Sequence, residues 1–148
     1  MVNHPTGSSG GALAHVGATL DLQSQSGRHF QITLTQVVDP AHSTGHTSAK
    51  SNKRFVATMF RVTNTSGQAL SGDGTFDANL VGSDGQTYLP DHQSLTDCAG
   101  ETTQYHIAAG KSATSCVPYQ VRKSVTIAKV QFFPAAGSAK DYGEWVVP

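Results

Sequence analysis

The chain has 148 residues, of which 37% are hydrophobic and only 14% charged, so it is long enough for one domain with a single hydrophobic core. Ten Lys and Arg residues balance ten Asp and Glu residues, and the zero net charge argues against a nucleic-acid or anionic-lipid partner. No apolar run approaches the roughly 18 residues of a membrane-spanning helix, and the abundance of Gly, Ser and Thr favours strands and turns over long helices.

The first part of the chain, residues 1–15, is expected to form a flexible tether, and residues 16–148 a single β domain. The opening eleven residues are rich in Gly and Ser and offer little to bury. They also lack the charged and then apolar segments of an export signal. We interpret them as lying downstream of an export signal or lipid anchor that was removed, with a natural cytosolic start or a cloning remnant as the alternative.

Apolar residues then recur with a period of two, which predicts antiparallel strands with one buried face. The first strand is expected at residues 19–23, and the second at residues 29–38, where apolar and polar residues alternate. Pro40 is expected to end the second strand because its nitrogen cannot donate to a sheet. Residues 41–53 have no apolar pattern, and we expect them to form a surface loop.

A third strand is expected at residues 54–64, in the centre of a sheet because both of its faces are apolar. Phe55 and Met59 lie on the face opposite to Val56 and Phe60. A loop or the edge of the second sheet would cover Phe55 and Met59; if they are uncovered, they form an apolar patch of the kind that marks a contact surface. These two residues are therefore the candidates for partner binding.

The alternation breaks over residues 64–74 and is expected to resume at Phe76. Asp84 and Gly85 then predict a two-residue hairpin, because both central positions of a type I′ turn require a positive φ. Further strands are expected at residues 102–107, 117–121, 127–133 and 144–147. About eight short strands separated by turn signals predict an all-β fold, an immunoglobulin-like antiparallel β-sandwich.

Cys98 and Cys116 are the only cysteines, and neither lies in a Cys-x-x-Cys or His-rich pattern, so a disulfide between them is the simplest prediction. Two buried thiols are the alternative. A disulfide that closes a loop of this length would stabilise the fold by about 3 kcal/mol on the chain-entropy model. It would also indicate an oxidising compartment.

The loop after the second strand contains the candidate metal ligands. His42 and His46, with Asp39 nearby, could in principle hold zinc or copper. A loop does not direct two imidazole rings toward one point, so we favour a solvated loop and expect neither a bound metal nor a cofactor.

No catalytic residues are expected. Residues 7–11 match the Gly-x-Ser-x-Gly pattern of hydrolases, but they lie in the tether and not in the strand-to-helix turn that this motif requires. No nucleophile, base and orienting group can be placed together from the sequence. Two short basic groups, at residues 50–54 and 122–123, lack an accompanying series of aromatic residues and are interpreted as solvated rims.

The order of several motifs resembles one protein family. These motifs are Val-Gly at 16–17, Val-Val-Asp-Pro at 37–40, Phe-Val-Ala at 55–57, Val-Thr-Asn-Thr at 62–65, Phe76, Ser-Asp-Gly-Gln-Thr-Tyr at 83–88, Val-Pro-Tyr-Gln-Val at 117–121 and Val-Gln-Phe-Phe at 130–133. From about residue 16 to the C-terminus, the chain resembles a domain-of-unknown-function family of secreted proteins and lipoproteins from Gram-positive bacteria. That family has the immunoglobulin-like fold of a small secreted mycobacterial immunogenic antigen.

The resemblance implies a β-sandwich at the cell envelope, frequently tethered by a lipidated N-terminus, and carries over no catalytic residues. This sequence departs from the family in two ways. It has no lipid-accepting cysteine near its start, and its loop after Pro40 is long and contains histidines.

We therefore expect a non-catalytic extracellular or cell-envelope binding module, secreted or on the outer face of the cell membrane. It would present residues 41–53 and 89–110 to a protein or envelope component whose identity the sequence does not give. The alternative is a secreted small-ligand or metal carrier that uses His42 and His46. A concave polar pocket with convergent His and Asp side chains would favour that alternative.

Overall fold

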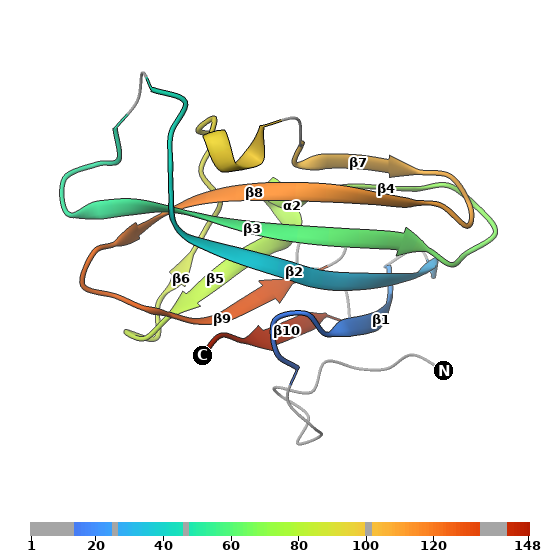
Figure 1. Cartoon of the computed structure of the whole chain (residues 1–148). Helices are drawn as coiled ribbons and strands as arrows, with labels where there is room; N and C mark the ends of the chain where they lie inside the picture. The colour runs from blue at the N-terminus through green and yellow to red at the C-terminus, as the bar shows by residue number, and fades with distance from the viewer. Residues whose placement is uncertain (1–13, 25–26, 46–47, 100–101, 134–141) are drawn as a thin grey trace.

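Ten β-strands make up most of the described part of the computed structural model (Figure 1). The described residues are 14–24, 27–45, 48–99, 102–133 and 142–148. The strands are β1 (Thr19–Gln23), β2 (His29–Ala41), β3 (Lys53–Asn64), β4 (Leu70–Asp73), β5 (Ala78–Gly82), β6 (Thr87–Tyr88), β7 (Gln104–Ile107), β8 (Ser112–Arg122), β9 (Ile127–Phe132) and β10 (Gly143–Val146).

The strands form two four-stranded antiparallel sheets that face each other. The first sheet has the order β1-β2-β3-β8 and the second the order β10-β9-β5-β6. β4 and β7 form a separate two-stranded ribbon that lies beside β8 (Figure 1). The predicted immunoglobulin-like β-sandwich is therefore confirmed.

One hydrophobic core fills the space between the two sheets, because alternate side chains of each strand point inward. Phe60 of β3 lies at its centre, with its ring centroid 5.4 Å from that of Phe132 and 5.8 Å from that of Trp145. Trp145 is fully buried, and its indole N–H donates to the carbonyl of Ala18 at 3.0 Å. This bond fastens the segment before β1 to β10 across the sandwich.

The chain also pairs with β10 before β1 begins. The amide of Val146 donates to the carbonyl of Ala14 at 2.8 Å, and His15 forms an isolated parallel bridge with Val146. Residues 1–13, which make up most of the predicted tether, lie outside the described residues. Within the described part of the chain, no helix combines the length and hydropathy that crossing a bilayer requires.

The prediction that Pro40 ends the second strand is wrong, because β2 continues to Ala41. The ladder between β2 and β3 is irregular between Val38 and Ala41, and Pro40 lies in that bulge. β1 pairs with β2 only as far as Thr33, so Pro40 disrupts no hydrogen bond on that side. A bulge next to an open edge is where a strand tolerates proline.

The segment at Phe76 also differs from the prediction, because α2 (Gly74–Asp77) forms a single helical turn there. Asp73 caps this turn: its carboxylate accepts from the Thr75 amide at 2.9 Å and from the Thr75 hydroxyl at 2.7 Å. Such an N-cap stabilises a helical turn because it satisfies a backbone amide that has no partner within the helix. The strand β5 therefore begins only at Ala78.

The predicted hairpin at Asp84 and Gly85 is present between β5 and β6, but its turn type differs. The amide of Gly85 donates to Gly82 O, and the amide of Gly82 to Gln86 O, both at 2.9 Å. Only Gly85 has a positive φ, of 78°, so the loop has three residues and ends in a glycine bulge. Asp84 keeps a negative φ because its carboxylate accepts from the Gln86 amide at 3.1 Å, which stabilises an Asx-type turn.

Candidate binding surface

Two long loops lie together on the outer face of the first sheet. One is the β2–β3 loop, residues 42–52, and the other is the segment between β6 and β7, residues 89–103, which contains the short helix η1 (Thr96–Cys98). Figure 1 shows η1 above β8 and β3, on the side away from the second sheet. We call the described residues of these two loops the loop layer.

A second hydrophobic cluster holds the loop layer on the sheet. Its buried members are Ala41, Phe55, Ala57, Leu95 and Cys116, and Val38, Ala49, Met59 and Cys98 pack against them. The strand β3 is apolar on both faces, so its outer face has to be covered as well as its inner face. The loop layer supplies that cover, and Leu95 is only 3% exposed as a result.

This arrangement decides between the two interpretations of Phe55 and Met59. Phe55 is 5% exposed and Met59 is half-buried, and both belong to the second cluster. A loop covers them, so the idea that they form an exposed apolar contact patch is wrong. The sequence could show that they face away from the core, but not that distant residues such as Leu95 would cover them.

The two loops are hydrogen-bonded to each other. The amide of Thr44 donates to Ser94 O at 3.2 Å, and the amide of Thr96 to His42 O at 2.7 Å. The carboxylate of Asp97 accepts from the His42 amide at 2.6 Å and lies 3.3 Å from Nδ1 of the same residue. Backbone pairing of this kind fixes the loops relative to each other.

The disulfide between Cys98 and Cys116 joins the loop layer covalently to β8. The predicted pairing of the two cysteines is thus present. Beside it, the amide of Cys116 donates to Thr102 O at 3.1 Å. The disulfide and this hydrogen bond therefore attach the loop layer to the same residue of β8, Cys116.

Gln120 of β8 connects both loops further along the strand. Its side-chain oxygen Oε1 accepts from the Lys50 backbone amide at 2.7 Å, and its side-chain nitrogen Nε2 donates to the carboxylate of Asp91. Asp91 also donates its own amide to Pro118 O at 2.8 Å. The loop layer is thus attached to β8 both at Cys116 and at Gln120.

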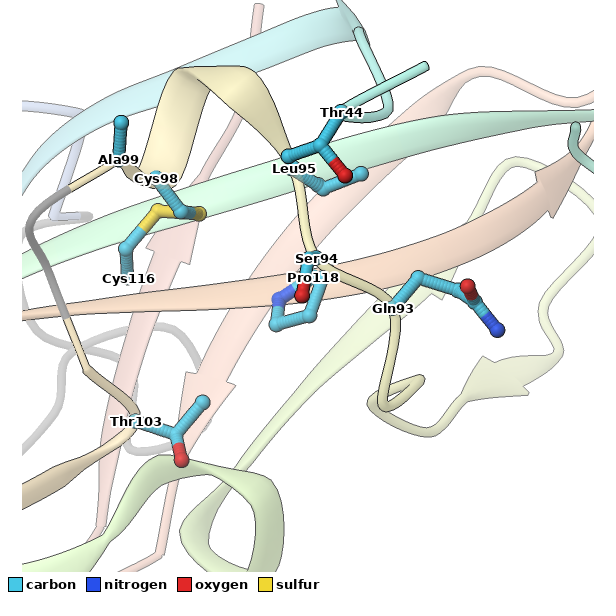
Figure 2. Close-up of a pocket in the computed structure, with 9 residues that line it drawn as sticks. All are labelled: Thr44, Gln93, Ser94, Leu95, Cys98, Ala99, Thr103, Cys116 and Pro118. Carbon is cyan, nitrogen blue, oxygen red and sulfur yellow. A yellow bond between two sulfur atoms is a disulfide. The ribbon is translucent and has the colours of Figure 1, made fainter. Parts of the chain in front are cut away.

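A cleft of about 310 Å³ opens between the loop layer and β8 (Figure 2). Leu95, Pro118 and the disulfide form apolar parts of its wall, whereas Thr44, Gln93, Ser94 and Thr103 supply polar groups. Its lining contains no charged side chain. A cleft of this size and mixed character fits an uncharged segment of a partner, such as a short stretch of peptide or a neutral sugar unit.

The structure places two of the three candidate metal ligands in other interactions. Asp39 forms a bidentate ion pair with Arg54, with its carboxylate oxygens 2.6 Å from Nε and 3.0 Å from Nη2. This hydrogen-bonded pair raises the pKa of Arg54 despite partial burial of the guanidinium. His42 is engaged with Asp97, and His46 lies outside the described residues. Among the described residues, no three His, Cys, Asp or Glu side chains gather as metal ligands would.

One pair of chemically reactive residues was not recognised from the sequence, because the two are 35 residues apart. Ser71 of β4 and His106 of β7 are cross-strand partners, and Oγ of Ser71 lies 2.5 Å from Nδ1 of His106. A nucleophile next to a base is one part of a catalytic site, but a third group has to orient the base. Both side chains are exposed, and within the described chain no carboxylate is bonded to His106.

These features define the chain as an immunoglobulin-like β-sandwich with a disulfide-linked loop layer on one sheet. The solved structures that share the sandwich fold include three of low sequence identity to this chain. YcdA of Bacillus subtilis, described as a candidate lipoprotein, matches with a TM-score of 0.63 and 16% identity over 89% of this chain. The secreted protein MPT63 of Mycobacterium tuberculosis matches with a TM-score of 0.63 and 14% identity over 90% of this chain and 95% of its own.

The third structure, the YjhA protein of Bacillus subtilis, has a TM-score of 0.61 and 14% identity, and the alignment covers 91% of this chain and 98% of that one. The chain spans only 38% of the length of YcdA. No protein-family model and no curated protein sequence matches this chain. At this level of identity, the likeness establishes the fold.

Proposed function

We propose that this protein is a non-catalytic binding module that acts outside the cytoplasm, either secreted or held on the outer face of the cell membrane. Two observations support the location. The disulfide between Cys98 and Cys116 requires an oxidising compartment to form and persist. Similar folds also occur in a secreted protein and in a candidate lipoprotein. We further propose that the chain belongs to the Gram-positive family of secreted proteins and lipoproteins that its motifs resemble.

The observation that carries the binding role is the attachment of the loop layer. Its two loops are bonded to each other and are joined to β8 by the disulfide, by Gln120 and by the second hydrophobic cluster. A loop that is already ordered loses little conformational entropy when a partner binds. Rigid sandwiches with fixed loops are common binding scaffolds for this reason.

The proposed contact site is the cleft between the loop layer and β8. Because its lining is uncharged and partly apolar, it fits a neutral segment of a protein or envelope polymer.

A steric block of the cleft tests this proposal. Ser94 is exposed at the rim, so S94W should fill the cleft without disturbing the core. Thr65 is exposed in the turn after the far end of β3, and T65W is the matched control. Both variants and the native protein would be immobilised and exposed to envelope extract, and the retained components would be quantified by mass spectrometry.

We expect S94W to lose the components that the native protein and T65W retain. Circular dichroism and thermal denaturation of the three proteins check that each remains folded. If S94W and T65W retain the same components in the same amounts, the cleft is not the binding site and the proposal fails.

A further inference from the structure

The fold brings together two basic groups that are about 70 residues apart in the sequence. In the ladder between β3 and β8, Lys53 lies directly opposite Arg122. The next residue, Lys123, donates its amide to Asn52 O at 2.8 Å. Five of the ten Lys and Arg residues of the chain, at positions 50, 53, 54, 122 and 123, therefore belong to the end of the sandwich where β3 begins and β8 ends (left side of Figure 1).

A cavity of about 390 Å³ lies between these two segments. Six residues line it: Ser51, Asn52, Lys53, Arg122, Lys123 and Ser124. Asn52 has a left-handed backbone, with a φ of 62°, which lets the loop turn into β3 at the rim of the cavity. We call this the basic cavity, and it lies outside the cleft of the loop layer.

Within the described residues, no direct ion pair neutralises the three cations that line the basic cavity. The charge of Arg122 nevertheless acts on Asp84 and, against desolvation and together with hydrogen bonds, lowers the pKa of that carboxyl. Arg54, just behind the cavity, is neutralised by Asp39 and donates to Arg122 O at 2.5 Å, so it serves to hold the strand ends together. In contrast, Lys53, Arg122 and Lys123 form no ion pair with any described carboxylate. Three cationic groups thus share one cavity without a neutralising acid within ion-pair distance in the described structure.

This arrangement opposes stability, because like charges directly across an antiparallel ladder repel each other. The core between the sheets shows no such repulsion: its buried residues are apolar, and the buried Asn64 has all of its side-chain polar atoms bonded. A local conflict of this kind is expected where the residues serve a function. An anion in the cavity would convert the repulsion into attraction.

We propose that the basic cavity binds a phosphate group carried by a small polar molecule. The guanidinium of Arg122 can donate two parallel hydrogen bonds to phosphate oxygens, and the two ammonium groups supply point charges. The hydroxyls of Ser51 and Ser124 and the amide of Asn52 add neutral donors. The site is distinct from the cleft, so its test is independent of the proposed binding module.

Two macromolecular alternatives fit the cavity less well. Docking onto an anionic membrane would need apolar side chains beside the cations, and none of the six lining residues is apolar. A nucleic acid would need an extended basic track, whereas the chain has zero net charge and the basic cavity is a single concave site lined by six residues.

The test uses sodium pyrophosphate as the probe and two-dimensional ¹H–¹⁵N NMR as the readout. In the native protein, shifts should saturate at millimolar pyrophosphate and cluster at residues 50–54 and 122–125. The variant K53Q/K123Q should weaken the fitted affinity at least tenfold. The control R61Q/K111Q removes the same charge from exposed sites elsewhere on β3 and in the β7–β8 turn and should bind like the native protein. R122K, which keeps the charge but loses the planar fork, should weaken binding several-fold.

Further titrations distinguish a phosphate group on a small molecule from other anions and from a lipid headgroup. Glycerol 3-phosphate should shift the same resonances as pyrophosphate, whereas citrate should bind more weakly. The proposal is overturned if no residue at the basic cavity responds to pyrophosphate, or if both double variants weaken binding equally. It is also overturned if citrate binds as tightly as pyrophosphate, or if only vesicles containing phosphatidylglycerol bind.

Discussion

Removing the disulfide by the double substitution C98A/C116A should lower the free energy of unfolding by about 3 kcal/mol. The two cysteines are 18 residues apart, and on the chain-entropy model a cross-link of that span removes roughly this much conformational freedom from the unfolded chain. For a chain of about 150 residues, each kcal/mol corresponds to about 2–4 °C in the melting temperature. The variant should therefore melt about 6–12 °C below the native protein.

Packing contributes a second, smaller part of the loss. Cys116 is 2% exposed and belongs to the second hydrophobic cluster with Leu95 and Phe55. Replacing its sulfur with a hydrogen leaves a small cavity beneath the loop layer. Reduced native protein retains both sulfur atoms, so its stability separates the effect of loop closure from that of packing.

The assay is urea denaturation of the oxidised native protein, the reduced native protein and C98A/C116A at one pH and temperature. We expect the reduced protein to lose most of the 3 kcal/mol and the double variant slightly more. A loss below about 1 kcal/mol in both would mean that the loop layer keeps its contacts to β8 even in the unfolded ensemble, or that the disulfide does not constrain it. Either result would refute the reasoning.

Three other predictions follow from buried groups in the sandwich. N64A should cost about 1–3 kcal/mol in urea denaturation, because the fully buried Asn64 side chain donates to Ile107 O at 2.9 Å and that carbonyl would lose its partner. Burial raises the pKa of Tyr105 and of Tyr119 above the ordinary value of about 10. The native protein should therefore lose stability above about pH 10, because the two tyrosine hydroxyls then ionise in the unfolded chain but stay protonated in the folded one. The variant Y119F should lose less stability between pH 8 and pH 11 than the native protein in denaturation curves. G72A should cost about 1–3 kcal/mol in thermal denaturation, since its Cβ would lie 2.2 Å from the Tyr105 hydroxyl and the buried ring would have to move.

Strands with a local signal could be predicted well from the sequence. The bounds of β1 match the expected residues 19–23, and in β2 the alternating Phe30, Ile32 and Leu34 are all buried. Side-chain alternation is a property of neighbouring residues, so it survives without knowledge of the partner strand. The Asp84 and Gly85 hairpin could be predicted for the same reason, because its turn residues are neighbours in the sequence.

Features that depend on distant pairing could not be predicted in this way. β7 lies within the strand expected at residues 102–107, but β4 falls in residues 64–74, where the alternation breaks, so the ribbon that pairs Leu70 with Ile107 could not be predicted. The single turn of α2 depends on the Asp73 side chain, which accepts a hydrogen bond from the Thr75 amide and so favours a helical turn over a strand.

The candidate sites show the same division. The pairing of Cys98 with Cys116 followed from their number, but the attachment of the loop layer to β8 did not. The two basic groups appeared as separate solvated rims because only the register of β3 against β8 places Lys53 opposite Arg122. Both proposed sites lie where loops and strand ends meet, and each is formed by residues that are far apart in the sequence.

Amide hydrogen exchange of the oxidised protein tests most directly whether the loops are held in place before any partner arrives. The amides of Thr44, Thr96 and Cys116 donate to carbonyls of the opposite loop or segment, and they should exchange far more slowly than the exposed amides of the β3–β4 turn. Exchange of all three at the rate of an unstructured peptide, with the disulfide intact, would contradict the account.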